Sequence, residues 1–362
     1  MLHLSSSNGC KAAITALAVL ALIATPALAG TVKEQRSFNS ESLTVRNLIG
    51  EITVEGHSGS DFEVDITIQG KDATSGLISI DDSDDQLDLK FPSKAKFVYP
   101  RLGKGSRTKF SVKDGDNDWL GALLSFGRDS GRIEVSGTGP GVEVWADLKI
   151  RVPAGKTLTV KHGVGTIDIQ DVGGEGRFST RSGAINASGL RGTMMLDTGS
   201  GHVVVKDVEG ELSIDTGSGH VEGSQLSGDR ISIDTGSGHV ELDEVDARRL
   251  SVDTGSGRVT ASRISADSAV IDTGSGGVEL ALDRMGDGDF RIDTGSGGIR
   301  LRLPEGVNAD VHAETGSGGI DVDLGDAVTM KRMKRDEASF TIGSGGAKID
   351  LDTGSGGIRI SR

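Results

Sequence analysis

Hydrophobic and polar residues alternate in short runs over much of the chain. Apolar side chains occupy alternate positions in 43–54 and 62–68, and glycine or serine separates the runs. The alternation returns at 133–135 and 142–152. A period of two over short runs bounded by glycine and serine is typical of strands with one buried face. We therefore expect an all-β protein.

A five-residue motif, Asp-Thr-Gly-Ser-Gly, divides the second half of the chain into similar units. Full copies begin at Asp197, Asp215, Asp234, Asp253, Asp272, Asp293 and Asp352, a Glu version begins at Glu314, and degenerate copies begin at Lys161, Ser179 and Thr341. Up to Glu314 the copies lie 18 to 21 residues apart, and the last two spacings are 27 and 11. A motif that recurs at a nearly fixed period indicates a repeat architecture.

The positions around the motif show how each unit folds. Apolar residues stand one and three places before the acid in the copies compared, and six places after it stand Val203, Val221, Val240, Val259, Val278, Ile299 and Ile320. Each copy thus reads as a strand, a glycine turn, a second strand and a variable loop. One such unit cannot bury its apolar face alone, so neighbours must stack about 4.8 Å apart. We predict a β-solenoid of 18–21-residue rungs with two short strands each. A meander of hairpins is the alternative, but hairpins favour two-residue turns.

The first 29 residues have the pattern of an export signal. The apolar run 12–24 follows Lys11, and Ala27-Leu28-Ala29 provides an A-x-A cleavage site before Gly30. The run is too short to span a bilayer of about 30 Å, and no later segment is long and apolar enough to do so. The single cysteine, Cys10, would be removed with the signal. We expect an exported protein of the periplasm or cell surface. Its mature chain would hold an irregular β module at 30–155 and the repeat solenoid at 156–362.

A basic segment interrupts the N-terminal module. Between residues 90 and 113 there are basic side chains and no acidic ones, and four aromatic residues are interleaved with them: Lys90, Phe91, Lys94, Lys96, Phe97, Tyr99, Arg101, Lys104, Arg107, Lys109, Phe110 and Lys113. An apolar stretch, Trp119 to Phe126, follows. Arginine, tyrosine and tryptophan are enriched at interfaces, so 90–126 is one candidate partner surface. The alternatives are an internal charge match with acids such as Asp81 and Asp88, and an apolar cap for the open end of the solenoid.

Composition narrows the partners and the core. The net charge is −14, which argues against general binding to nucleic acid or to anionic membranes. There are 55 glycines, whereas aromatic residues make up only 3%. The repeat core is therefore expected to consist of valine, isoleucine and leucine ladders.

The repeated aspartate has three possible interpretations. Asp-Thr-Gly-Ser resembles the signature of pepsin-like aspartic proteases, but that chemistry pairs two carboxylates across a cleft, and a column of them argues against it. An Asp that opens a turn can instead accept hydrogen bonds from backbone N–H groups. Calcium along the column, as in secreted β-rolls, is the remaining alternative, although the glycine pattern differs from theirs. We favour the turn interpretation.

A second column lies five positions after the acid and holds His202, His220 and His239, followed by Arg258. Stacked imidazoles could bind zinc or copper. The change to Arg258, Gly277 and Gly298 favours a simple exposed ladder instead. The sequence contains no nucleophile elbow, phosphate loop or zinc-protease motif. We assign no catalytic, cofactor-binding or metal residues and expect no cofactor.

The order of these parts resembles a known family. Leu43 to Val54, Leu148 to Val160, Gly165 to Ile169 and the repeated Thr-Gly-Ser-Gly-x-Val/Ile are similar to a bacterial exported β-strand-repeat family of unknown function labelled "putative adhesin". The resemblance implies a β-helix-like solenoid in the cell envelope and supplies no catalytic residues.

These observations give one leading hypothesis for function and two further alternatives. The leading one is a non-enzymatic, adhesin-like interaction scaffold with a protein or polysaccharide partner. A carbohydrate-active β-helix enzyme would need carboxylates beside sugar-stacking aromatics, which the repeat faces lack. An envelope-signalling accessory would bind its partner through 90–126.

Overall fold

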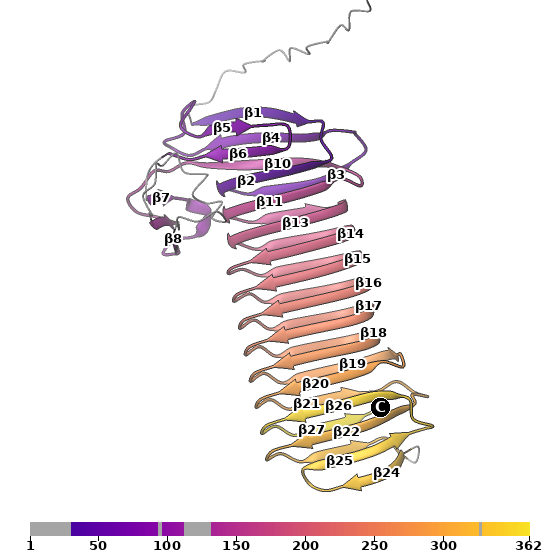
Figure 1. Cartoon of the computed structure of the whole chain (residues 1–362). Helices are drawn as coiled ribbons and strands as arrows, with labels where there is room; N and C mark the ends of the chain where they lie inside the picture. The colour runs from indigo at the N-terminus through magenta and orange to yellow at the C-terminus, as the bar shows by residue number, and fades with distance from the viewer. Residues whose placement is uncertain (1–29, 93–95, 112–131, 326–327) are drawn as a thin grey trace, which may run out of the picture.

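The computed structural model describes residues 30–92, 96–111, 132–325 and 328–362. These residues form strands that stack into one long column (Figure 1). Successive turns of the column, here called rungs, pair in parallel and in register. The predicted all-β solenoid is thus confirmed. The expected signal peptide and the stretch 119–126 lie outside the described residues. No helix in the described ranges is long and apolar enough to cross a membrane.

The central rungs contain the longest strands. They are β11 (Thr157–Val164), β12 (Ile167–Gln170), β13 (Gly173–Ser182), β14 (Ile185–Thr198), β15 (Val203–Thr216), β16 (Val221–Thr235), β17 (Val240–Thr254) and β18 (Val259–Thr273). Each rung has two sides that meet at a glycine corner, the Thr-Gly-Ser-Gly segment of the motif. We call the side that leads up to the motif's acid the Asp side, and the side that begins at the following valine the Val side.

In the central rungs, the variable loops expected between copies are bends within continuous strands. β15 runs from Val203 on the Val side to Thr216 on the next Asp side and bends at Asp207, whose φ is 54°. The equivalent residues of later rungs, Gln225, Glu244 and Arg263, also have positive φ. A left-handed residue that is not glycine costs about 1–2 kcal/mol, but it turns the chain within one residue. The expectation of two short strands and a loop was therefore wrong for these central rungs, but it holds for the rung of Asp293, whose two strands span Asp289–Thr294 and Ile299–Arg302. The step from an 18- to a 19-residue period is absorbed as a register shift between Glu209 and Leu212.

The interior consists of aliphatic ladders, as expected. The valine that begins each Val side is almost completely buried in the central rungs, as are the two apolar residues before each acid. Because every second side chain points inward along both sides, each ladder continues through successive rungs with its side chains in contact.

At the N-terminal end, strands from outside the repeats close the column. They are β1 (Thr31–Phe38), β2 (Ser42–Ile49), β3 (Ile52–His57), β4 (Phe62–Gln69), β5 (Ser79–Asp82), β6 (Gln86–Lys90) and β10 (Trp145–Pro153). β2 and β3 form a rung that stacks in parallel on β11 and β12. β1 and β4 then pair antiparallel on the Val side, and β5 pairs antiparallel with β6 on the Asp side.

The basic segment forms a small sheet beside this end. It contains β7 (Lys96–Val98), the 3-10 helix η1 (Pro100–Leu102), β8 (Arg107–Ser111) and β9 (Arg132–Ser136). β9 pairs in parallel with β7 and antiparallel with β8.

At the other end, the order of rungs in space differs from their order in sequence. The strands are β19 (Val278–Met285), β20 (Asp289–Thr294), β21 (Ile299–Arg302), β22 (Ala309–Thr315), β23 (Ile320–Asp323), β24 (Val328–Met333), β25 (Glu337–Ile342), β26 (Ala347–Thr353) and β27 (Ile358–Ser361). β26 pairs with β20 on one edge and with β22 on the other. The last rung in sequence, which carries Asp352, is therefore inserted between the rungs of Asp293 and Glu314 (Figure 1).

This insertion explains the irregular spacings of 27 and 11. β25 is antiparallel to β22, so Thr341 does not begin a glycine corner. The interpretation of Thr341–Gly345 as a degenerate copy was wrong. The copies that begin at Lys161 and Ser179 do align with Asp197 in the stack.

Candidate functional site

The glycine corner is held from inside by its threonine. Thr235 is fully buried, and its Oγ1 accepts a hydrogen bond from the Gly238 N–H at 3.0 Å and donates one to the carbonyl oxygen of Gly219, in the neighbouring rung, at 3.3 Å. Thr254 repeats both bonds one rung later. A buried hydroxyl that both donates and accepts satisfies two backbone groups that the corner would otherwise leave without partners.

The corner's glycines are required by close packing between rungs. A Cβ on Gly238 would lie 1.5 Å from the carbonyl oxygen of Gly219, and one on Gly257 would lie 1.7 Å from that of Gly238. No side chain fits at such distances. The motif is therefore a packing requirement of the stacked corner.

The aspartates do not have the role that we favoured from the sequence. Asp215, Asp234, Asp253 and Asp272 are exposed, and their side chains make no hydrogen bond to other described residues. Threonine supplies the corner's bonds instead, so the turn interpretation was wrong for the acid. The carboxylates align in register, and the pKa of Asp253 is raised by partial burial and then by Asp234 and Asp272 on either side.

The histidine column forms a stacked ladder. The rings of His202 and His220 lie 6.2 Å apart between centroids, those of His220 and His239 lie 6.0 Å apart, and both pairs meet edge to face. Nδ1 of His239 accepts a hydrogen bond from the backbone N–H of Arg258 at 3.0 Å. Across the described parts of the chain, no group of three or more His, Cys, Asp or Glu side chains is placed to hold a metal ion.

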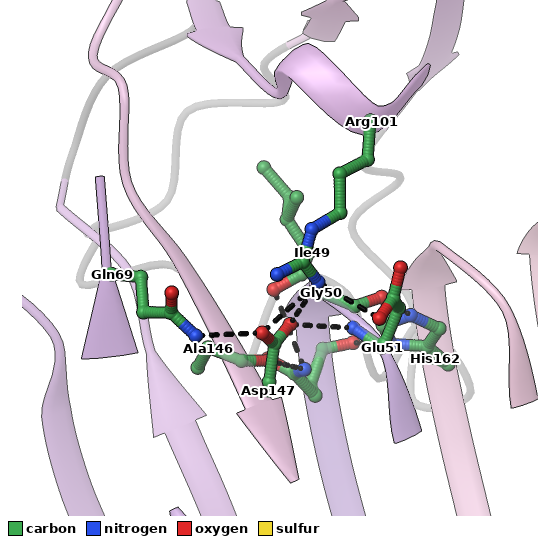
Figure 2. A network of polar contacts seen from close by, with 9 residues as sticks. Ile49, Gly50, Glu51, Gln69, Arg101, Ala146, Asp147 and His162 are labelled. Carbon is green, nitrogen blue, oxygen red and sulfur yellow. Dashed lines mark hydrogen bonds and ion pairs between the residues drawn. The ribbon is translucent and has the colours of Figure 1, made fainter. Parts of the chain in front are cut away.

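The rungs nearest the N-terminal end have other residues at the threonine position. In the stack, Asn47 and His162 precede Thr180 in this column, and all three are buried. Nδ1 of His162 lies 3.2 Å from the carbonyl oxygen of Asn47, and Nε2 lies 2.9 Å from that of Gly50. His162 and Gly50 are labelled in Figure 2. Burial lowers the pKa of His162 to about 4, so the ring is neutral at pH 7.

A polar cluster beside His162 anchors the basic segment (Figure 2). Arg101 on η1 forms ion pairs with Glu51 at 2.9 Å and Asp147 at 3.0 Å, and its guanidinium lies 5.7 Å from the centre of the Trp145 ring. Asp147 also accepts hydrogen bonds from the Gln69 side chain and from the Glu51 N–H, both at 2.9 Å. One carboxylate therefore joins η1, β4 and β10 to the turn between β2 and β3.

Aromatic residues of the basic segment pack inward. Phe91, Phe97 and Tyr99 are almost fully buried, and burial raises the pKa of Tyr99 to about 12. Lys90 contacts Asp81, and Arg107 and Lys109 both pair with Glu134. In the described part of the segment these contacts match the internal alternative, an anchored loop with its own counter-charges. Trp119 to Phe126 lie outside the described residues.

A groove that sequence reasoning missed opens near the C-terminal end. Its volume is about 580 Å³, and it runs over the Val sides of four rungs, where glycine replaces the histidine of earlier rungs: Gly277, Gly298, Gly357 and Gly319. Arg258, Arg300 and Arg359 line it, together with Glu279 and Asp321. The four glycines therefore form the floor of the groove, and the charged side chains form its walls.

The groove arginines are only partly neutralised. Arg300 and Arg359 are neighbours in register, and Arg359 pairs with the exposed Asp321 at 3.7 Å. Arg258 and Arg300 have no ion-pair partner among the described residues. Two stacked guanidinium groups beside an open floor can bind a carboxylate or phosphate through paired N–H donors.

Comparison with known proteins shows what part of the repeat is similar to. The family model described as Toastrack DUF4097 matches residues 210–361, which confirms the resemblance to a β-strand-repeat family of unknown function. No curated protein matches the chain. A crystal structure of a putative cell adhesion protein from Clostridium sporogenes is similar at 10% identity, with 91% of this chain and 99% of that chain covered and a TM-score of 0.20. A TM-score this low supports no conclusion about fold or function.

Proposed function

We propose that this protein is a non-enzymatic adhesion scaffold of the cell envelope that holds an acidic polysaccharide in the arginine groove. The observation that carries the proposal is the cluster of Arg258, Arg300 and Arg359 around a glycine floor that extends over four rungs. A groove along the stack suits a linear polymer. Two carboxylates of such a polymer would meet Arg300 and Arg359, which lie on adjacent rungs about 4.8 Å apart.

The scaffold around the groove supports this function. The groove's rungs are joined by continuous backbone ladders and by buried threonines, so the groove walls are held on a rigid element. The rest of the molecule is strongly acidic and repels a polyanion, which confines binding to the local arginine cluster.

Polymer binding tests the proposal. Full-length protein should bind polygalacturonate, and neutral dextran should not compete. Arg300→Glu and Arg359→Glu should each weaken binding at least tenfold. Arg249→Glu makes the same charge change at an exposed site outside the groove and should leave binding unchanged. Equal losses in all three variants, or no binding by the wild type, would contradict the groove assignment.

Two further measurements test the remaining parts of the proposal. Release of reducing ends from the bound polymer would show an enzyme, and we expect none. For export, the mass of the protein recovered from the envelope should correspond to a chain that begins at Gly30. A chain that retains Met1 and stays in the cytosol would contradict export.

A further inference from the structure

The two ends of the column carry oppositely charged runs with the same spacing. At the N-terminal end, β5 leads into Asp81-Asp82-Ser83-Asp84-Asp85. At the C-terminal end, β24 leads into Lys331-Arg332-Met333-Lys334-Arg335. All ten residues are exposed. When one run is aligned with the other in reverse, an acid faces a base at four of the five positions.

Both runs lie on the terminal strands of the same side of the solenoid. On the Asp side, β5 follows β6 and β2 at one end, and β24 follows β25 and β22 at the other (Figure 1). Asp81 faces Asp88, which faces Arg46 in the motif's acid column, and Glu337, next to the basic run, faces Glu314 in the same column. A second copy stacked along the same axis would therefore bring the two runs over each other.

The strand directions are compatible with pairing. β24 runs in the direction of the rungs because it is antiparallel to β25, and β25 is antiparallel to β22. β5 runs against them because it is antiparallel to β6. In a head-to-tail stack the two strands would be antiparallel. Among the described residues, β24 pairs only with β25 and β5 only with β6, so each has one open backbone edge. Open edges of this kind are templates for pairing between chains.

The C-terminal end also exposes apolar surface. Met330 and Met333 are 46% and 48% exposed, and they face Phe340 and Ala338 of the interior ladders. The two methionines cover this end of the interior, since Phe340 and Ala338 are fully buried, but they are themselves half exposed. A docked chain would cover both methionines while pairing the charges beside them.

We propose that a second copy of this chain docks head to tail, with its acidic β5 run on the basic β24 run of the first. Such an interface uses different surfaces on its two partners, and each added copy leaves both kinds of end open. Assembly then continues as a filament instead of closing as a dimer. Asp84, Asp85 and Arg335 have no ion pair with the described residues of their own chain, which leaves them available to the partner.

Sedimentation velocity on the full chain tests this proposal without any ligand. At low salt the weight-average mass should rise with concentration beyond a dimer, and 1 M NaCl, where the Debye length is about 3 Å, should reduce it. Asp84→Lys/Asp85→Lys and Lys334→Glu/Arg335→Glu should each raise the apparent dissociation constant at least tenfold. Glu211→Lys/Glu241→Lys makes the same charge change as the first of these variants, but on the middle rungs, and is its matched control.

Mixing the two end variants gives the sharpest outcome. Asp84→Lys/Asp85→Lys retains a functional basic end, and Lys334→Glu/Arg335→Glu retains a functional acidic end. An equimolar mixture of the two should therefore stop at dimers. Thermal melts of all variants confirm that they are folded. A wild type that stays monomeric at low salt, a closed dimer, or assembly unaffected by the reversals would overturn the proposal.

Discussion

The glycine corner exists in two versions, and their difference shows what the fold requires. In the central rungs, threonine sits inside the corner and aspartate outside it. In the two rungs nearest the N-terminal end, Arg46 and Lys161 stand outside, and Asn47 and His162 stand inside. The outer position therefore accepts either charge. The inner position holds a buried polar side chain in both versions, because the corner's backbone needs hydrogen-bond partners away from water.

The largest loss of stability should come from a substitution at a glycine that packs closely against the neighbouring rung. Gly238→Ala places a methyl group 1.5 Å from the carbonyl oxygen of Gly219, and only backbone movement can relieve that contact. We expect a loss of about 3 kcal/mol or more in the free energy of unfolding. Urea denaturation followed by circular dichroism measures it.

Gly277→Ala is the matched control, since its Cβ would meet nothing nearer than 3.3 Å and earlier rungs carry histidine or arginine in that column. A loss as large as that of Gly238→Ala would show that the corner is sensitive to any side chain.

The N-terminal version of the corner should depend on pH. The pKa of His162 is lowered to about 4 in the folded protein, below the ordinary value of about 6.5, so the unfolded chain binds the proton more tightly. Stability is therefore complete above about pH 6.5 and is lost as pH falls toward 4, by at most about 3 kcal/mol.

Denaturation of wild type and His162→Thr between pH 5 and 7 isolates this effect. The variant installs the threonine of the central rungs and should show a smaller slope. An identical slope in both proteins would mean that His162 already binds a proton in the folded state.

Removing the inner hydroxyl in a central rung should cost less. Thr235→Val keeps the shape but leaves the Gly238 N–H and the Gly219 carbonyl without their partner, so we expect a loss of about 1–3 kcal/mol. Thr235→Ser retains the oxygen and should lose less. Equal losses would mean that the hydroxyl contributes no more to stability than the methyl group does.

The smallest expected effect is a gain in stability, from a substitution at the motif's acid, outside the corner. Asp253 lies between Asp234 and Asp272, and its pKa is raised by burial and by those neighbours. A raised carboxyl pKa lowers stability as pH rises from the unfolded to the folded pKa. Asp253→Asn should therefore stabilise the protein at pH 7 by up to about 1 kcal/mol, and the gain should shrink near pH 3. Destabilisation at pH 7 would show a role for the carboxylate that the structure does not contain.

Sequence periodicity was sufficient to predict the stacked corner. The buried valine ladder and the 18–21-residue rung follow from alternation and spacing, both of which are local signals. The second corner was missed because its left-handed residues, Asp207, Gln225, Glu244 and Arg263, have no type in common. Glycine normally marks such a backbone, and here the stack imposes it on other residues.

The groove could not be predicted because it depends on rungs that are out of sequence order. Arg300 and Arg359 are neighbours only because β27 lies between β21 and β23. In the sequence, Gly277 and Gly298 served only as an argument against a histidine metal site. That these glycines form the floor of a groove can be seen only once the side chains around them are placed.

The inserted rung also constrains the order in which the protein can be built. Residues 309–323 rest on residues 347–361, which the ribosome makes later and which must pass through any export channel later. Earlier rungs can add one by one to a finished platform as they emerge. The segment 309–323 cannot pack until residues 347–361 have been made, so its apolar side chains stay uncovered until the end of synthesis.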